Sequence, residues 1–226
     1  RTVGELDQAL LALDGTANKS RLGANTILAV SLAFTRAQAV EAGQPLYRAF
    51  ATVAGRAAPT TLPRPTINLF SGGRHAGGQV AIQDVLVVPA SARRMDEALA
   101  MTVEVYHAAA ELCLRKYGTR ALKADEGGLA PPFPHAEAML EDAAAAIQAA
   151  GLKPGADVAL AVDVASTHFH RDGRYHLDGD VLTAPAMVER LDAWLRRYPI
   201  VRLEDGLAED DWEHWPELRA AVADRA

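Results

Sequence analysis

The first part of the chain carries apolar side chains at helical spacing. Leu6, Leu10 and Leu13 recur at intervals of three and four, which places them on one face of a helix. A second, longer apolar helix is predicted from Ala24 to Val40. This stretch of sequence carries no strand signal, so we expect it to be helical.

The pattern changes after a stretch with the composition of a linker. Residues 54–65 are small, Pro-bearing and Arg-bearing, which is typical of a connection between two packing units. We therefore expect a domain boundary near Thr60, dividing the chain into residues 1–59 and 60–226. Beyond the boundary, short apolar runs predict four buried strands: Pro65 to Leu69, Val80 to Pro89, Val158 to Val164 and Ile200 to Leu203.

Helical patterns separate these runs. Asp96 to Tyr117 and Ala136 to Ala150 each end at a glycine, and Thr183 occupies an N-cap position before a third helix. One face of the first of these helices is predicted to carry Leu99, Val103, Tyr106, Ala110 and Leu114. The order of elements from residue 65 is therefore ββααβαβα.

This order predicts the fold class. Helices that alternate with continuously apolar strands favour an α/β domain with a parallel sheet. A (β/α)₈ barrel needs eight strands, so the four predicted here amount to half of one. We expect the second region to be part of a modified (β/α)₈ barrel, preceded by a helical segment.

Composition and charge narrow the class of protein. Half of the 226 residues are hydrophobic and 23% are charged, which is typical of a globular chain. The net charge is −6 without a block of Lys and Arg, which argues against nucleic acid as a partner. The single cysteine, Cys113, excludes an intrachain disulfide and fits a cytoplasmic setting. Apolar runs fall short of the roughly 18 residues of a membrane helix, so we expect no membrane partner.

Acidic residues mark a candidate site. Four positions lie at or just past the carboxyl end of an apolar run: Asp84, Glu126 with Asp125, Asp163, and Glu204 with Asp205. Barrel active sites are built at that end of the strands. Asp163 follows a buried run and would need a cation or several donors to stay ionised. Asp163 and Glu204, on consecutive parallel strands, are predicted to stand side by side and to suit Mg²⁺. The alternative is that each carboxylate caps the next helix.

Two glycine-bearing loops add candidate residues. Glu126 lies in a loop whose glycines let the backbone approach a ligand closely, although a loop acid can also be merely solvated. His75 lies in a loop with glycines on both sides and can reach over a substrate, although a lone loop histidine is often only exposed. The sequence contains neither a P-loop nor a Gly-x-Ser-x-Gly motif, which disfavours nucleotide binding and serine hydrolase chemistry.

Specific motifs follow one another along nearly the whole chain. Those of the first part are Leu13 to Thr16, Asn18 to Ser20, Leu22 to Asn25 with Ile27 to Ala33, and Gly43 to Tyr47. Those of the second part are Gly72-Gly73, His75-Ala76, Ile82-Gln83, Asp125 to Gly128, Lys153 to Gly155, and Glu204 to Trp212. In this order they resemble the motifs of enolase, the phosphopyruvate hydratase family.

The resemblance implies a fold and an activity. Enolases have a small α+β N-terminal domain and a modified barrel that opens ββαα, so residues 1–59 would be the helical end of the former and 60–226 the first half of the latter. The implied reaction is the Mg²⁺-dependent dehydration of 2-phospho-D-glycerate to phosphoenolpyruvate in glycolysis. The implied ligand is a small phosphorylated carboxylate, and the implied assembly is a homodimer or larger homo-oligomer.

The resemblance also implies roles for individual residues. Asp163 and Glu204 look like two of three Mg²⁺ ligands, Glu126 looks like the general acid, and His75, Gln83, Asp84 and Glu204 would face the substrate. A third metal carboxylate, a base lysine and a phosphate-binding Arg-Ser pair would follow Ala226, and a lid loop would precede Arg1. We therefore expect the 226 residues alone to be inactive.

Departures from the enolase pattern leave the substrate open. Asp84 stands where enolases usually have Glu, Lys123-Ala124 where they have Val-Gly, and Thr167-His168 where they have Ser-Glu. Lys123 is expected to form an ion pair with the acids that follow it. One alternative is an enolase-like enzyme that acts on a related phosphonate or carboxylate. Another is a catalytically silent fragment with a structural or binding role.

Overall fold

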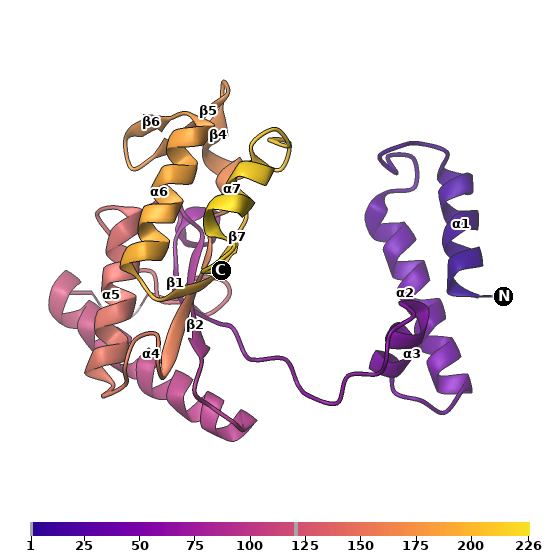
Figure 1. Cartoon of the computed structure of the whole chain (residues 1–226), viewed down its shortest axis with the longest axis horizontal. Coiled ribbons are helices and arrows are strands. Elements are labelled where there is room, and N and C mark those ends of the chain that lie inside the picture. The colour runs from indigo at the N-terminus through magenta and orange to yellow at the C-terminus, as the bar shows by residue number, and fades with distance from the viewer. Residues whose placement is uncertain (1, 120–121) are drawn as a thin grey trace. The chain divides into compact units, whose positions relative to one another are not determined.

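The computed structural model describes residues 2–119 and 122–226, which form two compact units. The first unit ends at Pro63 and the second begins at Arg64. The regular elements described in the first unit are the helices α1 (Val3–Asp14), α2 (Ala24–Glu41) and α3 (Leu46–Val53) (Figure 1). The predicted helical character is confirmed, although Leu13 is 55% exposed rather than part of a buried face.

The second unit is built on a four-stranded sheet with the order β1-β2-β3-β7. Its strands are β1 (Ile67–Ser71), β2 (Asp84–Pro89), β3 (Val158–Asp163) and β7 (Ile200–Glu204). β1 and β2 pair antiparallel, as do β2 and β3, and only β3 and β7 are parallel. The prediction of a fully parallel sheet is therefore wrong for the first two pairs. Continuous apolar character indicates burial on both faces and carries no information on strand direction.

The apolar run from Val80 to Pro89 is only partly a strand. Residues 80–82 form bends, and β2 begins at Asp84. The Gly72 N–H donates a hydrogen bond to the Gln83 carbonyl at 2.6 Å, so this short segment folds back onto the end of β1. The connection between β1 and β2 forms a short 3₁₀ helix and bends instead of a crossover helix, which fits their antiparallel arrangement.

A second, three-stranded antiparallel sheet was not predicted. It consists of β4 (His170–Arg171), β5 (Arg174–Leu177) and β6 (Asp180–Leu182). Each of its two hairpins turns on an Asp-Gly pair in which both residues have positive φ. The φ angles are 53° and 68° at Asp172-Gly173, and 52° and 91° at Asp178-Gly179. Asp-Gly is a strong signal for such tight turns, but strands of two to four residues carry too little periodicity to be recognised.

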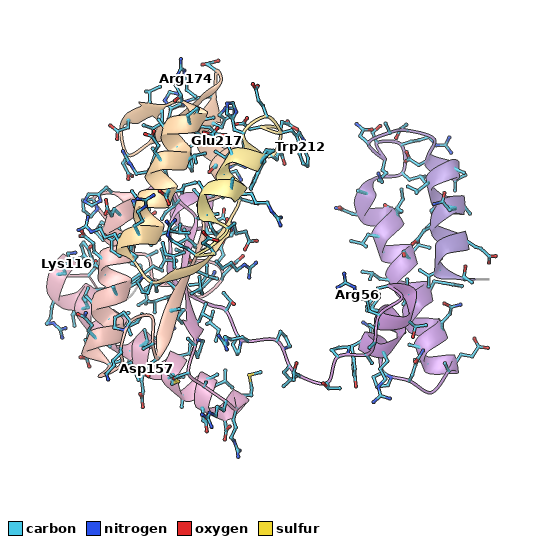
Figure 2. All side chains as sticks on the ribbon, viewed as in Figure 1. Arg56, Lys116, Asp157, Arg174, Trp212 and Glu217 are labelled. Carbon is cyan, nitrogen blue, oxygen red and sulfur yellow. The ribbon has the colours of Figure 1, made fainter. Side chains whose placement is uncertain are left out.

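Helices cover the sheet of the second unit. They are α4 (Met95–Tyr117), α5 (Ala136–Ala149), α6 (Ala184–Arg197) and α7 (Trp215–Val222), with the short 3₁₀ helices η1 (Gly73–Ala76) and η2 (Ser166–Phe169). α4 and α5 contact β1 and β2, and α6 contacts β7. The predicted cap at Thr183 is confirmed, because its hydroxyl accepts a hydrogen bond from the Ala186 N–H at 3.2 Å. Trp212, just before α7, lies 76% exposed at the surface (Figure 2).

The buried face of α4 differs from the predicted one. Leu99, Val103 and Leu114 are about half exposed, at 49%, 54% and 56%. The buried residues are Ala98, Thr102, Val105, Ala109 and Cys113. Both sets recur at helical spacing, and the interface uses the smaller side chains, which allow the helix to pack closely.

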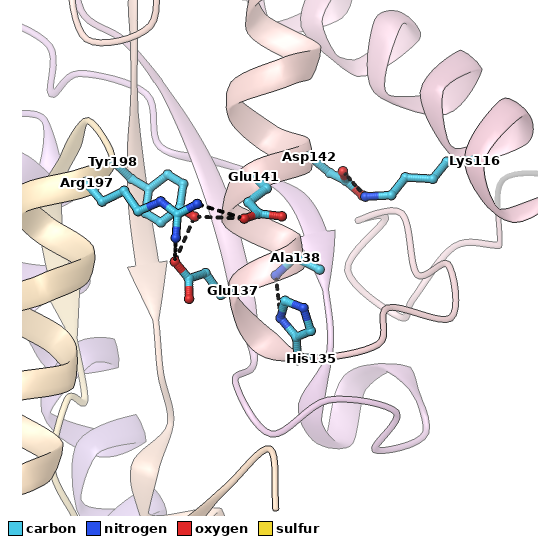
Figure 3. Close-up of polar contacts among 8 residues, drawn as sticks. All are labelled: Lys116, His135, Glu137, Ala138, Glu141, Asp142, Arg197 and Tyr198. Carbon is cyan, nitrogen blue, oxygen red and sulfur yellow. Dashed lines mark hydrogen bonds and ion pairs between the residues drawn. The ribbon is translucent and has the colours of Figure 1, made fainter. Parts of the chain in front are cut away.

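Ion pairs join α5 to the helices beside it (Figure 3). Lys116 on α4 lies 2.6 Å from the buried carboxylate of Asp142 on α5. Arg197 at the end of α6 contacts Glu137 at 2.6 Å and Glu141 at 3.1 Å, one turn apart on α5. These contacts link α4, α5 and α6. The combination of these helices with the main sheet confirms the predicted α/β class.

Membrane insertion of a helix is not supported. Among residues 2–119 and 122–226, none of the helices combines the length and the apolar character that a span requires.

Candidate active site

One rung of the main sheet carries four polar side chains. The strand register pairs Ser71 with Asp84, Asp84 with Asp163, and Asp163 with Glu204. The expectation that Asp84 ends its strand is wrong, because Asp84 is the first residue of β2. Since β2 runs antiparallel to its neighbours, its beginning lies at the edge where β1, β3 and β7 end. The sheet therefore brings Asp84, Asp163 and Glu204 to the same edge, as their assignment to one site requires.

A histidine and two carboxylates form a compact cluster at this edge. His75 Nδ1 lies 3.6 Å from Asp84 Oδ2 and 3.7 Å from Glu126 Oε1. The Asp84 side chain is only 4% exposed, whereas those of His75 and Glu126 are 29% and 55% exposed. One ligand atom from each residue lies within 4.8 Å of the others, so the three side chains have the spacing of a metal site. The same spacing suits proton transfer to a bound ligand.

Two residues that the sequence analysis did not single out hold this cluster in place. Ser71 Oγ donates a hydrogen bond to Asp84 Oδ1 at 2.6 Å, and Asn68 Nδ2 donates to Glu126 Oε2 at 2.8 Å. Both donors come from β1 and act on residues far away in sequence. No local sequence signal reports such a contact, because it depends on the packing of distant segments.

The loop that carries Glu126 is docked on β1 through its backbone. The Ser71 N–H donates to the Leu129 carbonyl at 2.9 Å, and the Leu129 N–H donates to the Leu69 carbonyl at 2.8 Å. A Cβ at Gly128 would lie 2.3 Å from Ser71 Oγ, so only glycine fits there. The glycine motif thus brings Glu126 close to the sheet edge, as predicted.

Asp84 and Asp163 are unfavourable places for negative charge. Burial raises the pKa of Asp84, while the hydrogen bond from Ser71 and the nearby His75 oppose the rise. Burial, followed by the charges of Glu204, Asp205 and Asp84, raises the pKa of Asp163 to about 6. This accumulation of carboxylates is typical of a site that takes up a cation.

Asp163 and Glu204 differ in their present partners. Asp163 accepts hydrogen bonds from Gln83 Nε2 at Oδ2 and from the Ala165 N–H at Oδ1, both at 3.1 Å. Glu204 lies 2.6 Å from Arg202 on the same strand. The two carboxylates therefore share a rung of the sheet, but each has its own contacts.

A cavity of about 350 Å³ opens beside Asp163. Of the predicted site residues, Gln83 and Asp163 line it. The other lining residues are Arg74, Ala165, Thr167, His168, Asp205, Leu207 and Glu209. A volume of this size accommodates a small substrate. Arg74 had not been singled out in the sequence, although it directly precedes His75.

Lys123 lies near the Glu126 loop without pairing with it. Among the described residues it forms no ion pair, and its Nζ lies 6.0 Å from the centroid of the Tyr106 ring. The expected ion pair with the acids that follow is therefore wrong. Tyr106 in turn donates a hydrogen bond from its hydroxyl to the Gly127 carbonyl at 2.9 Å, so Tyr106 supports the loop.

Comparison with known families agrees with this arrangement. A family described as the C-terminal TIM barrel domain of enolase matches residues 59–226, and one described as the N-terminal domain of enolase matches residues 1–50.

Proposed function

Because these matches cover most of its length, the chain belongs to the enolase family, and from that premise we propose that the full-length gene product removes water from 2-phospho-D-glycerate to give phosphoenolpyruvate, with Mg²⁺ as cofactor. The observation that carries the proposal is the common rung of Asp84, Asp163 and Glu204, with His75 and Glu126 beside it. This arrangement supports the proposal, because several carboxylates and an imidazole share one sheet edge.

Glu126 is the proposed general acid. Its carboxyl group is 55% exposed and is held by Asn68 at one oxygen, while the other oxygen faces His75. In this position it can donate a proton to a departing hydroxyl group of a ligand at the sheet edge. Asp84 is buried and is fixed by the hydrogen bond from Ser71. Its proposed role is to orient His75 by facing Nδ1 of the imidazole.

Asp163 and Glu204 are the proposed metal ligands. The residues fit a hard divalent cation, because Asp163 and Glu204 are oxygen donors at paired positions of adjacent strands, and because burial, followed by the charges of Glu204, Asp205 and Asp84, raises the pKa of Asp163. Mg²⁺, when bound, stabilises the extra negative charge that develops on the substrate carboxylate as a proton is removed. Gln83 orients Asp163 through its amide. Among the described residues Arg202 contacts Oε2 of Glu204, so Oε1 can contribute to the metal without loss of this contact.

A related substrate is a second candidate function. Asp84 is one methylene shorter than the glutamate expected from the enolase pattern, yet it is fully engaged by Ser71. A pocket rebuilt around the shorter side chain would suit a related phosphonate or carboxylate. We further propose a cytoplasmic location and a homo-oligomeric assembly, both supported by family membership.

An absorbance assay of phosphoenolpyruvate formation tests the proposed function. The full-length gene product is stripped of metal with EDTA, supplied with 2-phosphoglycerate and titrated with Mg²⁺. We expect turnover that appears with Mg²⁺ and disappears with EDTA. Asp163→Asn should lose most of this activity, whereas Glu104→Gln, an exposed change on α4, should retain it. Turnover that needs no divalent cation, or no turnover at saturating Mg²⁺, would exclude the proposed reaction.

A further inference from the structure

Two basic side chains line the cavity beside Asp163 without a partner. Arg74 comes from η1 and His168 from η2. Among residues 2–119 and 122–226, neither side chain makes a hydrogen bond or an ion pair. Three carboxylates, those of Asp163, Asp205 and Glu209, line the same cavity. Both residues are exposed, so their basic groups are accessible to a ligand.

We propose that Arg74 and His168 bind an additional anionic group of the substrate, beyond the carboxylate and phosphate of 2-phosphoglycerate, and so determine substrate preference. This inference rests on the function proposed above, because it assigns the cavity to the substrate. A guanidinium and an imidazole N–H together offer several donors to a carboxylate or phosphonate. The carboxylates of the same cavity would repel a second anionic group of the substrate. Binding of that group there therefore requires cationic donors such as Arg74 and His168.

The wall that carries His168 is fixed before a ligand arrives. η2 is joined to the loop after β7 by three hydrogen bonds: Ser166 N–H to the Asp205 carbonyl at 3.0 Å, Ser166 Oγ to the Gly206 carbonyl at 2.9 Å, and Glu209 N–H to Thr167 Oγ1 at 2.9 Å. His168 N–H also donates to the Ala165 carbonyl at 3.0 Å. A preformed wall lowers the entropy cost of binding.

The loop that carries Arg74 packs against Gln83, which also lines the cavity. The loop of Arg74 is held on Gln83 by the Gly72 hydrogen bond, and a Cβ at Gly73 would lie 3.2 Å from the Gln83 Cα. Gln83 itself lines the cavity and donates from Nε2 to Asp163 Oδ2 at 3.1 Å. The loop that carries Arg74 is therefore packed on a residue of the cavity.

Two probes that differ by one carboxymethyl group test the proposal. Phosphonoacetate carries a phosphonate and one carboxylate, and 2-phosphonosuccinate adds a second carboxylate. Their dissociation constants are measured by calorimetry on the full-length gene product with Mg²⁺ present. We expect 2-phosphonosuccinate to bind about ten- to hundredfold more tightly, the range for charge-assisted hydrogen bonds. Arg74→Gln and His168→Gln should each reduce this ratio while changing the affinity for phosphonoacetate less than about twofold.

The controls are Arg93→Gln and His107→Gln, two exposed changes outside the cavity, which should leave the ratio as in the wild type. A wild-type ratio near one, or a ratio that the cavity variants do not change, overturns the inference. Parallel assays with 2-phosphoglycerate separate this failure from that of the proposed function. Normal turnover with a ratio near one removes only the extra anion site, whereas a ratio that depends on Arg74 without turnover removes only the proposed reaction.

Discussion

Asp163 is unfavourable for the stability of the fold and is also a proposed metal ligand. It ends a strand whose other residues are all buried, and its carboxylate lies near those of Glu204, Asp205 and Asp84. Two donors, from Gln83 and the Ala165 N–H, offset only part of this repulsion. Such a residue lowers the free energy of unfolding unless a cation is bound, and this trade of stability for function is common at active sites.

The raised pKa of Asp163 predicts a stability difference that depends on pH. Folding raises its pKa from 3.8 to about 6, so the folded state holds the proton more tightly and stability falls as the pH rises through this window. Asp163→Asn removes the effect. With EDTA present, urea unfolding should show the variant equal to wild type near pH 4 and more stable by about 1–2 kcal/mol above pH 6. A difference that does not change with pH would contradict the assigned cause.

At the scale of elements, the loop between β7 and α7 is held by one buried tyrosine. The Tyr175 hydroxyl donates to Asp211 Oδ2 at 2.6 Å and accepts from the Ala208 N–H at 3.0 Å. Asp211 Oδ1 also lies 2.6 Å from His214 Nδ1. Because the loop begins directly after Glu204, these bonds fix the segment that leads out of the proposed metal site.

Tyr175→Phe should loosen this loop. The change leaves the Ala208 N–H without its partner, and an unsatisfied buried group costs about 1–3 kcal/mol. We expect a lower midpoint in urea and faster amide hydrogen exchange in residues 205–214, with exchange in α5 unchanged. The control is Tyr47→Phe, which removes a hydroxyl from a residue that is 48% exposed. Wild-type exchange in the loop of Tyr175→Phe would show that the hydroxyl does not hold it.

Several elements could be predicted from the sequence because their signals are local. The helices ending near Gly118 and Gly151 and the strand Val158–Asp163 lie within a residue or two of their predicted bounds. The direction of β2 and the two Asp-Gly hairpins were missed, since apolar runs do not report direction and very short strands have little periodicity. The predicted face of α4 is wrong for Leu99, Val103 and Leu114, whereas Tyr106 and Ala110 do pack against the core, because two neighbouring stripes share the same spacing.

The candidate site shows the same division. His75, Asp84, Glu126, Asp163 and Glu204 were predicted from their types and positions, and the structure brings them to one sheet edge. Their supporting residues were not predicted, because Ser71 and Asn68 act across the fold on distant partners. Candidate site residues can thus be selected from motifs, whereas the contacts that position them require the tertiary structure.

At the scale of the whole molecule, Mg²⁺ should couple the site to stability. A ligand that binds the folded state alone raises the melting temperature. We expect the full-length gene product to melt at a higher temperature with Mg²⁺ than with EDTA, and Asp163→Asn to lose most of that shift. Asp224→Asn, an exposed change near the end of the chain, should keep it. An equal shift in Asp163→Asn would place the bound Mg²⁺ elsewhere.

The most direct test of the enolase account separates proton abstraction from loss of water. Glu126→Gln keeps the shape of the side chain but cannot donate a proton, so dehydration should fall by several orders of magnitude while proton removal continues. The measurement follows 2-phosphoglycerate in D₂O with Mg²⁺ by NMR, recording deuterium at the carbon next to the carboxylate and the phosphoenolpyruvate formed. We expect full-length Glu126→Gln still to incorporate deuterium but to form almost no phosphoenolpyruvate. Near-normal phosphoenolpyruvate formation by this variant would contradict the enolase account.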